Sequence, residues 1–470
     1  MKVFNVEFQH RCALFVAIVV ALCGPISAIV TNNFVDPVPV FSVKGSSISL
    51  LSKKLGNESA NISVNFSPYT QIIKSCYKAD GTESARLGDR VGHWGMGAMA
   101  RDIIANPGAS SSAWVPVLGD PTTFPLFWAQ AKDKVASLNT VNFIQQTDLF
   151  YSVDFDYEKV GMRAEVAFEP AEGFVCSLQG GICDHKTSAP RYWNPVTSAA
   201  YLETSGAESA DPTMAAFMWA TRRETYFAEL GLDVSGYQNV ELDDFTAQVA
   251  FSYPLIFKDD PKAAVRLVPR ATVGLIIPSD EIMKKKKVSP LKDNVVQGLV
   301  PVGNDGFTGL LMEGAVCLDF QDTINFTVAG GYTIFKERSI TGYRLPNNKY
   351  QAILYPFKQD ISKKRGGTWH LGASMFAEEF IQGMQCFVDY SWTVHRRDKI
   401  TLDDATKLPL FKDGIEAESR RSEFRVGTAH LGLSYKIAKH IEAGFAMQGA
   451  LHGSQVFKPY TFMGSLFIVF

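Results

Sequence analysis

Apolar and polar residues alternate along much of the chain, with the period of two that is typical of a β-strand. In the segment 245–253, Phe245, Val249 and Tyr253 lie on one parity, and Thr246 and Gln248 lie on the other. Because successive side chains of a strand point to opposite faces of the sheet, such a segment has one apolar and one polar face. The alternation therefore predicts an all-β protein built from amphipathic strands.

About fourteen segments show this alternation, and those at 61–76 and 215–219 show it most weakly. The predicted strands are 61–76, 149–157, 162–168, 215–219, 226–234, 245–253, 267–277, 310–320, 324–334, 369–375, 384–394, 429–435, 441–451 and 458–470. The strands 149–157 and 162–168 are expected to form a hairpin around a turn at 158–161.

The connections between the predicted strands alternate between short and long. The short ones are 158–161, 222–224, 254–264, 321–323, 378–381 and 438–440, and the longest are 77–148, 169–212, 278–307, 335–367 and 398–423. Transmembrane β-barrels have short turns on one side of the membrane and long loops on the other. A soluble β-sandwich has no reason to sort its connections in this way, and closing the sheet also removes exposed edge strands. The sorting predicts a barrel, provided that both weak strands form.

The final strand, 458–470, is amphipathic, with Tyr460, Leu466 and Phe470 among the apolar residues of one parity. This strand, together with the alternating strands before it, resembles the closing strand of Gram-negative outer-membrane β-barrels of the porin-like class. The resemblance implies a transmembrane antiparallel up-and-down β-barrel, and the count of alternating segments predicts about 14 strands (12–16) for it. It also implies contact with outer-membrane lipid and recognition of the C-terminal strand by the barrel assembly machinery. Strand 458–470 is expected to pair with 61–76 and so to close the barrel.

The N-terminus has the pattern of a secretory signal peptide. Lys2 and Arg11 precede the apolar run 12–23, and a plausible cleavage site follows Ala28. The sequence therefore predicts export and a division into a signal peptide 1–28, a periplasmic N-terminal segment 29–60 and a transmembrane barrel 61–470. Within the barrel, residues 77–148 are expected to form either a long outer loop or a plug.

Composition agrees with a barrel. The formal net charge of −2 argues against a nucleic-acid-binding protein. The hydrophobic content of 46 % is too low for a helical membrane bundle, and no stretch after residue 28 is as long and apolar as a transmembrane helix. The same content suits a barrel in which only alternate residues meet lipid.

Motifs for catalysis or cofactor binding are lacking, since the chain has no G-x-S-x-G, H-E-x-x-H, P-loop or dinucleotide-binding fingerprint. We therefore expect no enzyme and no cofactor. Cys176 and Cys183 lie on either side of a Gly-Gly pair, and an oxidising compartment would permit a disulfide between them. A metal site is not expected, because no second Cys pair or His pair has ligand spacing.

The polar faces of the strands would line the lumen, where charged side chains set the local field and hence the ion preference. The candidate pore-lining residues are Asp154, Asp156, Arg163, Glu165, Arg266, Arg270, Glu313, Asp319, Asp389, Glu423 and Arg425. Any single one of them is more readily a solvated or cross-strand-paired residue, whereas the whole set indicates a lined pore.

These observations favour an outer-membrane channel for the passive diffusion of small solutes. One alternative is a surface-exposed structural or partner-binding barrel with a blocked lumen. Another is a transporter of hydrophobic solutes similar to the long-chain fatty-acid transporters, although their Asn-Pro-Ala signature is absent near the N-terminus. The solute and the ion preference stay open. A homo-oligomer is possible, but no stretch of the apolar face can be assigned to a second copy of the chain rather than to lipid.

Overall fold

The computed structural model describes residues 62–90, 92, 94–95, 150–171, 173–193, 233–253, 255–256, 265–279, 306–320, 324–346 and 357–470. The predicted signal peptide, the segment 29–60, the predicted strands 215–219 and 226–234, and most of 77–148 lie outside these residues.

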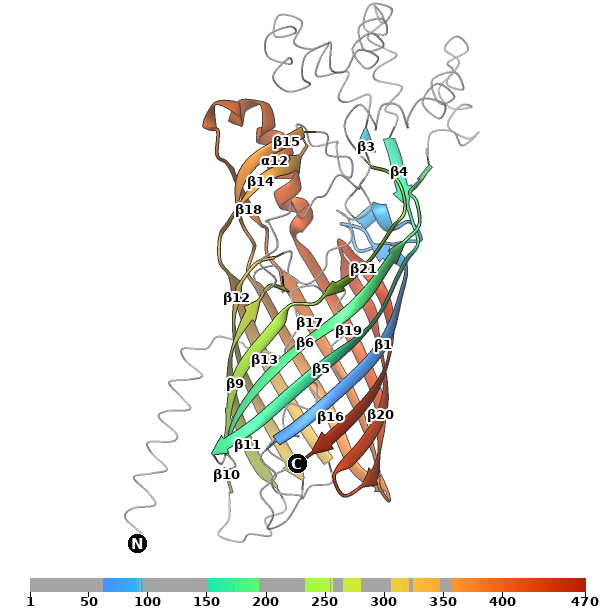
Figure 1. The fold of residues 1–470 in the computed structure, drawn as a ribbon, viewed down its shortest axis with the longest axis vertical. Helices are drawn as coiled ribbons and strands as arrows, with labels where there is room; N and C mark the ends of the chain where they lie inside the picture. Colours follow the sequence, from blue (N-terminus) through green and yellow to red (C-terminus); the bar gives the residue numbers. More distant parts are fainter. Residues whose placement is uncertain are drawn as a thin grey trace, which may run out of the picture.

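Twelve of the described strands form a closed antiparallel barrel, in which each strand is hydrogen-bonded to the next along the chain (Figure 1). They are β1 (Ile62–Tyr77), β5 (Tyr157–Ala171), β6 (Phe174–Thr187), β9 (Phe245–Ser252), β11 (Arg266–Ile277), β12 (Gly309–Phe320), β13 (Ile324–Phe335), β16 (Thr368–Ile381), β17 (Met384–His395), β19 (Phe424–Ala438), β20 (Ile441–Ser454) and β21 (Val456–Val469). The predicted all-β up-and-down barrel is therefore confirmed, with a strand number at the lower end of the predicted range.

Strand β21 closes the barrel against β1. Val64 is the register partner of Ile468, and the backbone N–H of Phe470 donates to the carbonyl of Ile62 at 2.8 Å. The pairing predicted from the weak alternation at 61–76 is confirmed.

The outward face of the barrel is apolar. Large hydrophobic side chains on this parity are exposed on every barrel strand, among them Leu178 (51 %), Val328 (57 %) and Phe445 (53 %). A continuous exposed apolar surface of this extent is unfavourable in water and marks an interaction surface. Together with the closed sheet, which leaves no unpaired strand edge, it identifies a wall that faces lipid.

The two rims of the barrel differ in the length of their connections. At the rim that carries Ile62 and Phe470, residues 172–173, 321–323, 382–383 and 439–440 join consecutive strands, and the longer connection 253–265 joins β9 to β11; we call this the short-turn rim. At the opposite rim, 78–156, 188–236, 278–308, 336–367 and 396–423 make long connections, and only the turn at Gln455 is tight. The long connections predicted from the sequence therefore lie at this rim. One of them differs in position, because the connection predicted at 169–212 is found at 188–236.

The predicted hairpin of 149–157 and 162–168 is wrong, because β5 runs unbroken through the expected turn. Glu158 and Lys159 resemble turn residues, yet Val160 continues the outward apolar parity. Lys159 is fully buried on the inward parity, where its ammonium group pairs with Asp243. The residues before β5 form β4 (Phe150–Asp154), which belongs to a separate small sheet with β3 (Trp94–Gly95) and β7 (Arg191–Trp193).

Strand β6 lies in the segment 169–212, which the sequence predicts to be a long connection. Its alternation is interrupted by Gly180 and Gly181, and both glycines make room for neighbouring side chains. A Cβ atom on Gly180 would lie 2.7 Å from the ring of Phe245, and one on Gly181 would lie 2.8 Å from the carboxylate of Asp243. The glycines therefore belong to the packing of a barrel strand.

Two short strands extend the barrel pairing. β8 (Tyr237–Leu242) pairs with the long-connection end of β6, and β9 pairs with its other end. Asp243 and Asp244 interrupt the strand between β8 and β9. β10 (Leu255–Ile256) continues the pairing along β11.

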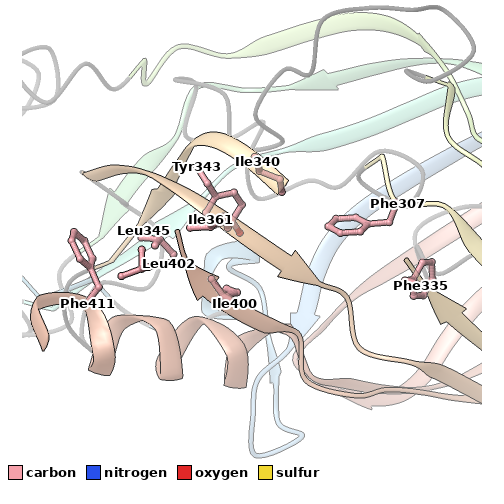
Figure 2. Packing of buried hydrophobic residues seen from close by; sticks show 9 residues of the cluster. All are labelled: Phe307, Phe335, Ile340, Tyr343, Leu345, Ile361, Ile400, Leu402 and Phe411. Atoms are coloured by element: carbon pink, nitrogen blue, oxygen red, sulfur yellow. The ribbon is translucent and has the colours of Figure 1, made fainter. Parts of the chain in front are cut away.

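A small cap sheet lies beyond the long-connection rim (Figure 1). It consists of β14 (Arg338–Leu345), β15 (Phe357–Lys364) and β18 (Lys399–Leu402), followed by the short helix η3 (Ala405–Lys407) and by α12 (Leu408–Ser422). Figure 2 shows its core, in which Ile340, Ile361, Leu402 and Phe411 are among the buried side chains. Among the described residues, no helix is long and apolar enough to cross a membrane.

Candidate functional site in the barrel lumen

Polar side chains on the inward parity form one continuous row, which we call the polar row. Each member is the register partner of the next on nine consecutive barrel strands, from β6 to β13. The members are His185, Lys159, Gln71, Thr461, Gln448, His430, Asp389, Ser374 and Thr327. His185 lies two residues from the long-connection end of β6, and Thr327 lies three residues from the short-turn end of β13. The row therefore crosses the inner wall diagonally between the two rims.

Hydrogen bonds hold members of the polar row to their neighbours. The amide Nε2 of Gln71 donates to Thr461 Oγ1 at 2.8 Å. His430 Nδ1 lies 2.6 Å from Asp389 Oδ2. Cross-strand pairs of this kind fix the side chains against the wall.

An apolar row runs beside the polar row, one inward position closer to the short-turn rim. Its register partners are Cys183, Gly161, Tyr69, Met463, Ala446, Gly432, Phe387 and Phe376. The two glycines let aromatic rings lie along the wall: a Cβ on Gly161 would be 2.7 Å from Tyr69 Cζ, and one on Gly432 would overlap the ring of Phe387. The inner wall thus presents an apolar stripe next to a polar one.

A cluster of charges surrounds Asp243, at the interruption between β8 and β9. Its carboxylate oxygens lie 3.4 Å from Lys159 Nζ and 3.4 Å from Arg163 Nη1. Cys183 Sγ lies 3.3 Å from Asp243 Oδ1 and 2.9 Å from His185 Nε2. Among the described residues, no group of three or more His, Cys, Asp or Glu side chains has the arrangement of a metal site. We therefore interpret the cluster as an ion-pair network.

Two further ion pairs join β11 to β12. Arg270 Nη2 lies 2.6 Å from Glu313 Oε1, and Arg266 Nη1 lies 3.6 Å from Asp319 Oδ2. With Lys159 and Arg163 held by Asp243, each of these four inner-wall cations has a carboxylate partner. The fixed charges of this part of the lumen therefore largely cancel.

The structure places seven of the eleven candidate pore-lining residues on the inward face of the barrel. They are Arg163, Glu165, Arg266, Arg270, Glu313, Asp319 and Asp389. Most of them are buried, which shows that side chains occupy much of the described lumen. The twelve strands of this barrel enclose a narrower space than the fourteen strands expected from the sequence would.

The other four candidates do not line the lumen. Asp154 and Asp156 lie in and after β4, outside the barrel, where both pair with Arg191. The hydrogen bonds from Arg191 lower the pKa of Asp156 below its ordinary value. Glu423 and Arg425 lie at the long-connection rim, and the Arg425 side chain is 58 % exposed. A hydrogen bond from Arg397 lowers the pKa of Glu423. These side chains belong to the outer surface.

The predicted disulfide between Cys176 and Cys183 is wrong. The two residues lie on the same strand, β6, with Cys176 on the outward parity and Cys183 on the inward one. Seven residues of extended strand separate their Cα atoms by about 24 Å, whereas a disulfide needs a separation below about 7 Å. The five described cysteines are free thiols.

Several inner-wall residues escape the sequence analysis. Lys159 and Asp243 each sit in a segment that resembles a turn, and their charges conceal the strand alternation around them. Gln179 and His185 lie on β6, which the sequence does not predict. The remaining signal was the parity of Val160, which continues the outward apolar series through the supposed turn.

No family model matches the sequence, and no curated protein shows a significant match. Solved structures similar to the chain are outer-membrane β-barrels. An outer-membrane channel from Pseudomonas putida F1 is 8 % identical, with a TM-score of 0.46 over 88 % of this chain and 98 % of that one. The KdgM porin, solved with oligogalacturonate, is 9 % identical, with a TM-score of 0.27 over 68 % and 96 %. Outer-membrane phospholipase A from Escherichia coli is 8 % identical, with a TM-score of 0.28 over 89 % and 97 %. Such identities and TM-scores transfer neither a family nor a function.

Proposed function

We propose that the protein is a narrow outer-membrane channel for the passive diffusion of small solutes. The closed barrel with its apolar outer face supports insertion in a bilayer. The polar inner wall supports a path through it, because burying polar groups away from water or a polar solute is costly.

The observation that carries the proposal is the polar row. The interior of a transmembrane barrel is polar whether it is open or plugged, so the feature that favours a channel is the continuity of the row. Here nine strands in succession place a hydrogen-bonding side chain at the same register, and the resulting row links the two rims. A hydrated solute needs such a series of exchangeable partners on its way through a bilayer.

Planar-bilayer recording of the purified protein tests the proposal. Discrete conductance steps are expected, and a silent protein would refute it. Phe387→Ala removes bulk from the apolar row and is expected to raise the conductance. Phe445→Ala removes the same bulk from the lipid-facing side of β20 and is expected to leave the conductance unchanged.

The blocked-lumen barrel is the second candidate, and the burial of the inner wall favours it. Gln71 and Lys159 are 0 % exposed and Met463 is 2 % exposed. In that case the long connections and the cap sheet would form a partner-binding surface. The same recordings separate the candidates: a silent wild type together with a conducting Phe387→Ala variant would support the blocked barrel.

We also propose export to the bacterial outer membrane through a cleaved signal peptide, with assembly guided by the C-terminal strand. N-terminal sequencing of the mature protein is expected to begin at Ile29, and a mature chain that retains Met1 would refute cleavage. Phe470 is 66 % exposed beyond the last barrel strand. Phe470→Ala is therefore expected to lower the amount of protein in the outer membrane while leaving the thermal stability of the assembled fraction unchanged.

A further inference from the structure

An aromatic cluster lies on the outward face of β17, β19 and β20, close to the long-connection rim. Trp392 on β17 and His452 on β20 are both register partners of Gly427, which lies between them on β19. The rings of Trp392 and His452 stack with their centroids 5.0 Å apart. His452 Nε2 lies 2.8 Å from the hydroxyl oxygen of Tyr390, which is also on β17. We call Tyr390, Trp392 and His452 the aromatic cluster.

Two features of the backbone bring His452 onto this face. The pairing of β19 with β20 shifts there by one residue, because Gly427 pairs with His452 whereas Thr428 pairs with Ala450. This bulge leaves Leu451 and His452 both exposed, although regular alternation would turn one of them inward. Gly427 then makes room for the imidazole: a Cβ atom on Gly427 would overlap the ring of His452. The position of His452 is therefore built into the sheet.

Two arginines lie next to the aromatic cluster on its rim side. Arg425 is on β19, two residues before Gly427, and Arg397 follows the end of β17. Their side chains are 58 % and 57 % exposed. Both contact one carboxylate, since Glu423 Oε2 lies 2.8 Å from Arg397 Nε and Glu423 Oε1 lies 3.5 Å from Arg425 Nη2. Two positive charges share one negative charge, so this group keeps a net charge of +1.

Further cations lie in the same connection between β17 and β18. Arg396 and Lys399 are exposed, and the acidic residue near them, Asp398, is buried. The Asp398 carboxylate lies 3.1 Å from Lys363 Nζ and 3.1 Å from His395 Nε2, so its charge is already compensated. The rim beside the aromatic cluster is therefore basic, whereas the charges of the inner wall largely cancel.

The outward face thus changes in character towards the rim. Leu431 and Leu433 on β19 are exposed and apolar, and the aromatic cluster follows them. Aromatic rings of this kind lie at the level of the lipid headgroups. Arg425 lies beyond Gly427 by two residues, which corresponds to about 7 Å along the strand. An amphiphile on this face therefore meets apolar side chains first, then aromatic rings, and then guanidinium groups.

We infer that this face binds a phosphorylated glycolipid of the outer leaflet, of the lipid A kind. The guanidinium groups of Arg397 and Arg425 bind its phosphate, because arginine matches a phosphate group with two parallel hydrogen bonds. The apolar carbon face of its sugar packs against Trp392 and His452, and its acyl chains lie along Leu431. The long connections of outer-membrane barrels face outwards, which selects the outer leaflet. This inference rests on the outer-membrane location and is independent of conduction through the lumen.

Native mass spectrometry of the delipidated protein in a non-ionic detergent tests the inference. The probes are diphosphorylated lipid A, the same lipid without its phosphates, and phosphatidylglycerol. Diphosphorylated lipid A is expected to bind most tightly. Arg397→Gln and Arg425→Gln are each expected to weaken its binding roughly fivefold, as loss of one arginine near an anionic lipid implies. Glu423→Gln removes the competing carboxylate and is expected to strengthen the binding, whereas a purely structural role of the arginines predicts no gain.

Arg191→Gln makes the same substitution at an exposed, ion-paired arginine away from the aromatic cluster and is the matched control. It is expected to leave lipid A binding unchanged. Each variant is first shown to be folded by its heat-modifiable mobility on a gel. The inference fails if the Arg397→Gln/Arg425→Gln double variant binds lipid A like the wild type, or if lipid A without phosphates binds equally well. Equally tight binding of phosphatidylglycerol would overturn the assignment to a glycolipid. Planar-bilayer recording of the same samples reports separately on the channel function.

Discussion

The carboxylate of Asp243 is expected to be the most important single charge for the stability of the barrel. Asp243 lies between β8 and β9, and its carboxylate contacts Lys159 and Arg163 on β5. Strand β6 lies between β5 and this segment. The side chains of Lys159 and Asp243 are 0 % and 1 % exposed, so solvent screens the pair very little. Asp243→Asn removes the charge with almost no change in volume, and two buried cations lose the carboxylate that both of them contact.

The magnitude follows from the distances. At 3.4 Å and an effective dielectric constant of about 20, each pair contributes about 5 kcal/mol of attraction before desolvation. Removing one partner of a buried pair typically costs about 3–5 kcal/mol, because the other charge stays buried. Asparagine keeps one hydrogen-bond acceptor and the neighbouring wall is polar, so we expect a loss of about 3 kcal/mol in the free energy of unfolding.

Urea unfolding in lipid vesicles measures this loss, and a double-mutant cycle with Lys159→Met assigns it to the pair. The double variant is expected to lose less than the sum of the two single variants, because removal of both partners leaves fewer unpaired charges. The reversal potential in a KCl gradient is a second measurement, and Asp243→Asn is expected to shift it towards anions. A loss below about 1 kcal/mol, the value of a surface ion pair, with an unchanged reversal potential would refute the reasoning.

Three further predictions follow from single contacts. Gly161→Ala places a Cβ 2.6 Å from a backbone carbonyl oxygen and is expected to cost about 1–3 kcal/mol. Gly449→Ala meets no atom closer than 3.7 Å and is the control, and equal melting temperatures for the two variants would contradict the packing argument. In the cap sheet, burial raises the pKa of Asp398, but Lys363 and His395 lower it by more, so the net shift is downward. The ionised carboxylate of Asp398 therefore stabilises the cap above about pH 4, the ordinary pKa of Asp, and this stabilisation is lost as the pH falls further. Protease resistance of the cap is expected to fall in acid. This pH dependence is expected to disappear in the Asp398→Asn variant. Unfolded mature protein without reductant is expected to react with five equivalents of maleimide, whereas three would indicate a disulfide.

Nine of the twelve barrel strands, from β9 onwards, match segments predicted from alternation alone, and β1 is a tenth. Their apolar parity meets lipid, which demands hydrophobicity at every second position and little else. The turns that join several of them are two or three residues long, so the boundaries of the strands are also visible in the sequence. Because lipid is apolar along the whole outer wall, the alternation that it requires can be recognised within each strand alone.

The predictions fail where a strand depends on contacts with residues far away in the sequence. Lys159 is acceptable inside the barrel because Asp243, 84 residues later, approaches it. Gly180 is acceptable in a strand because the ring of Phe245 covers it. Neither partner is recognisable from the local sequence, so the alternation predicts two strands in place of β5 and none at β6. The cap sheet is not predicted either, because its core is assembled from three separate connections.

The same dependence on distant partners explains why the sequence identifies the pore-lining charges only in part. The sequence shows each charged residue without its partner, and eleven such residues predict an electric field in the lumen. The structure places four of them at the surface, and it places the remaining arginines beside carboxylates of other segments of the chain. Cancellation of this kind cannot be recognised in the sequence, because it depends on which strands become neighbours and on how far each charge lies from its partner.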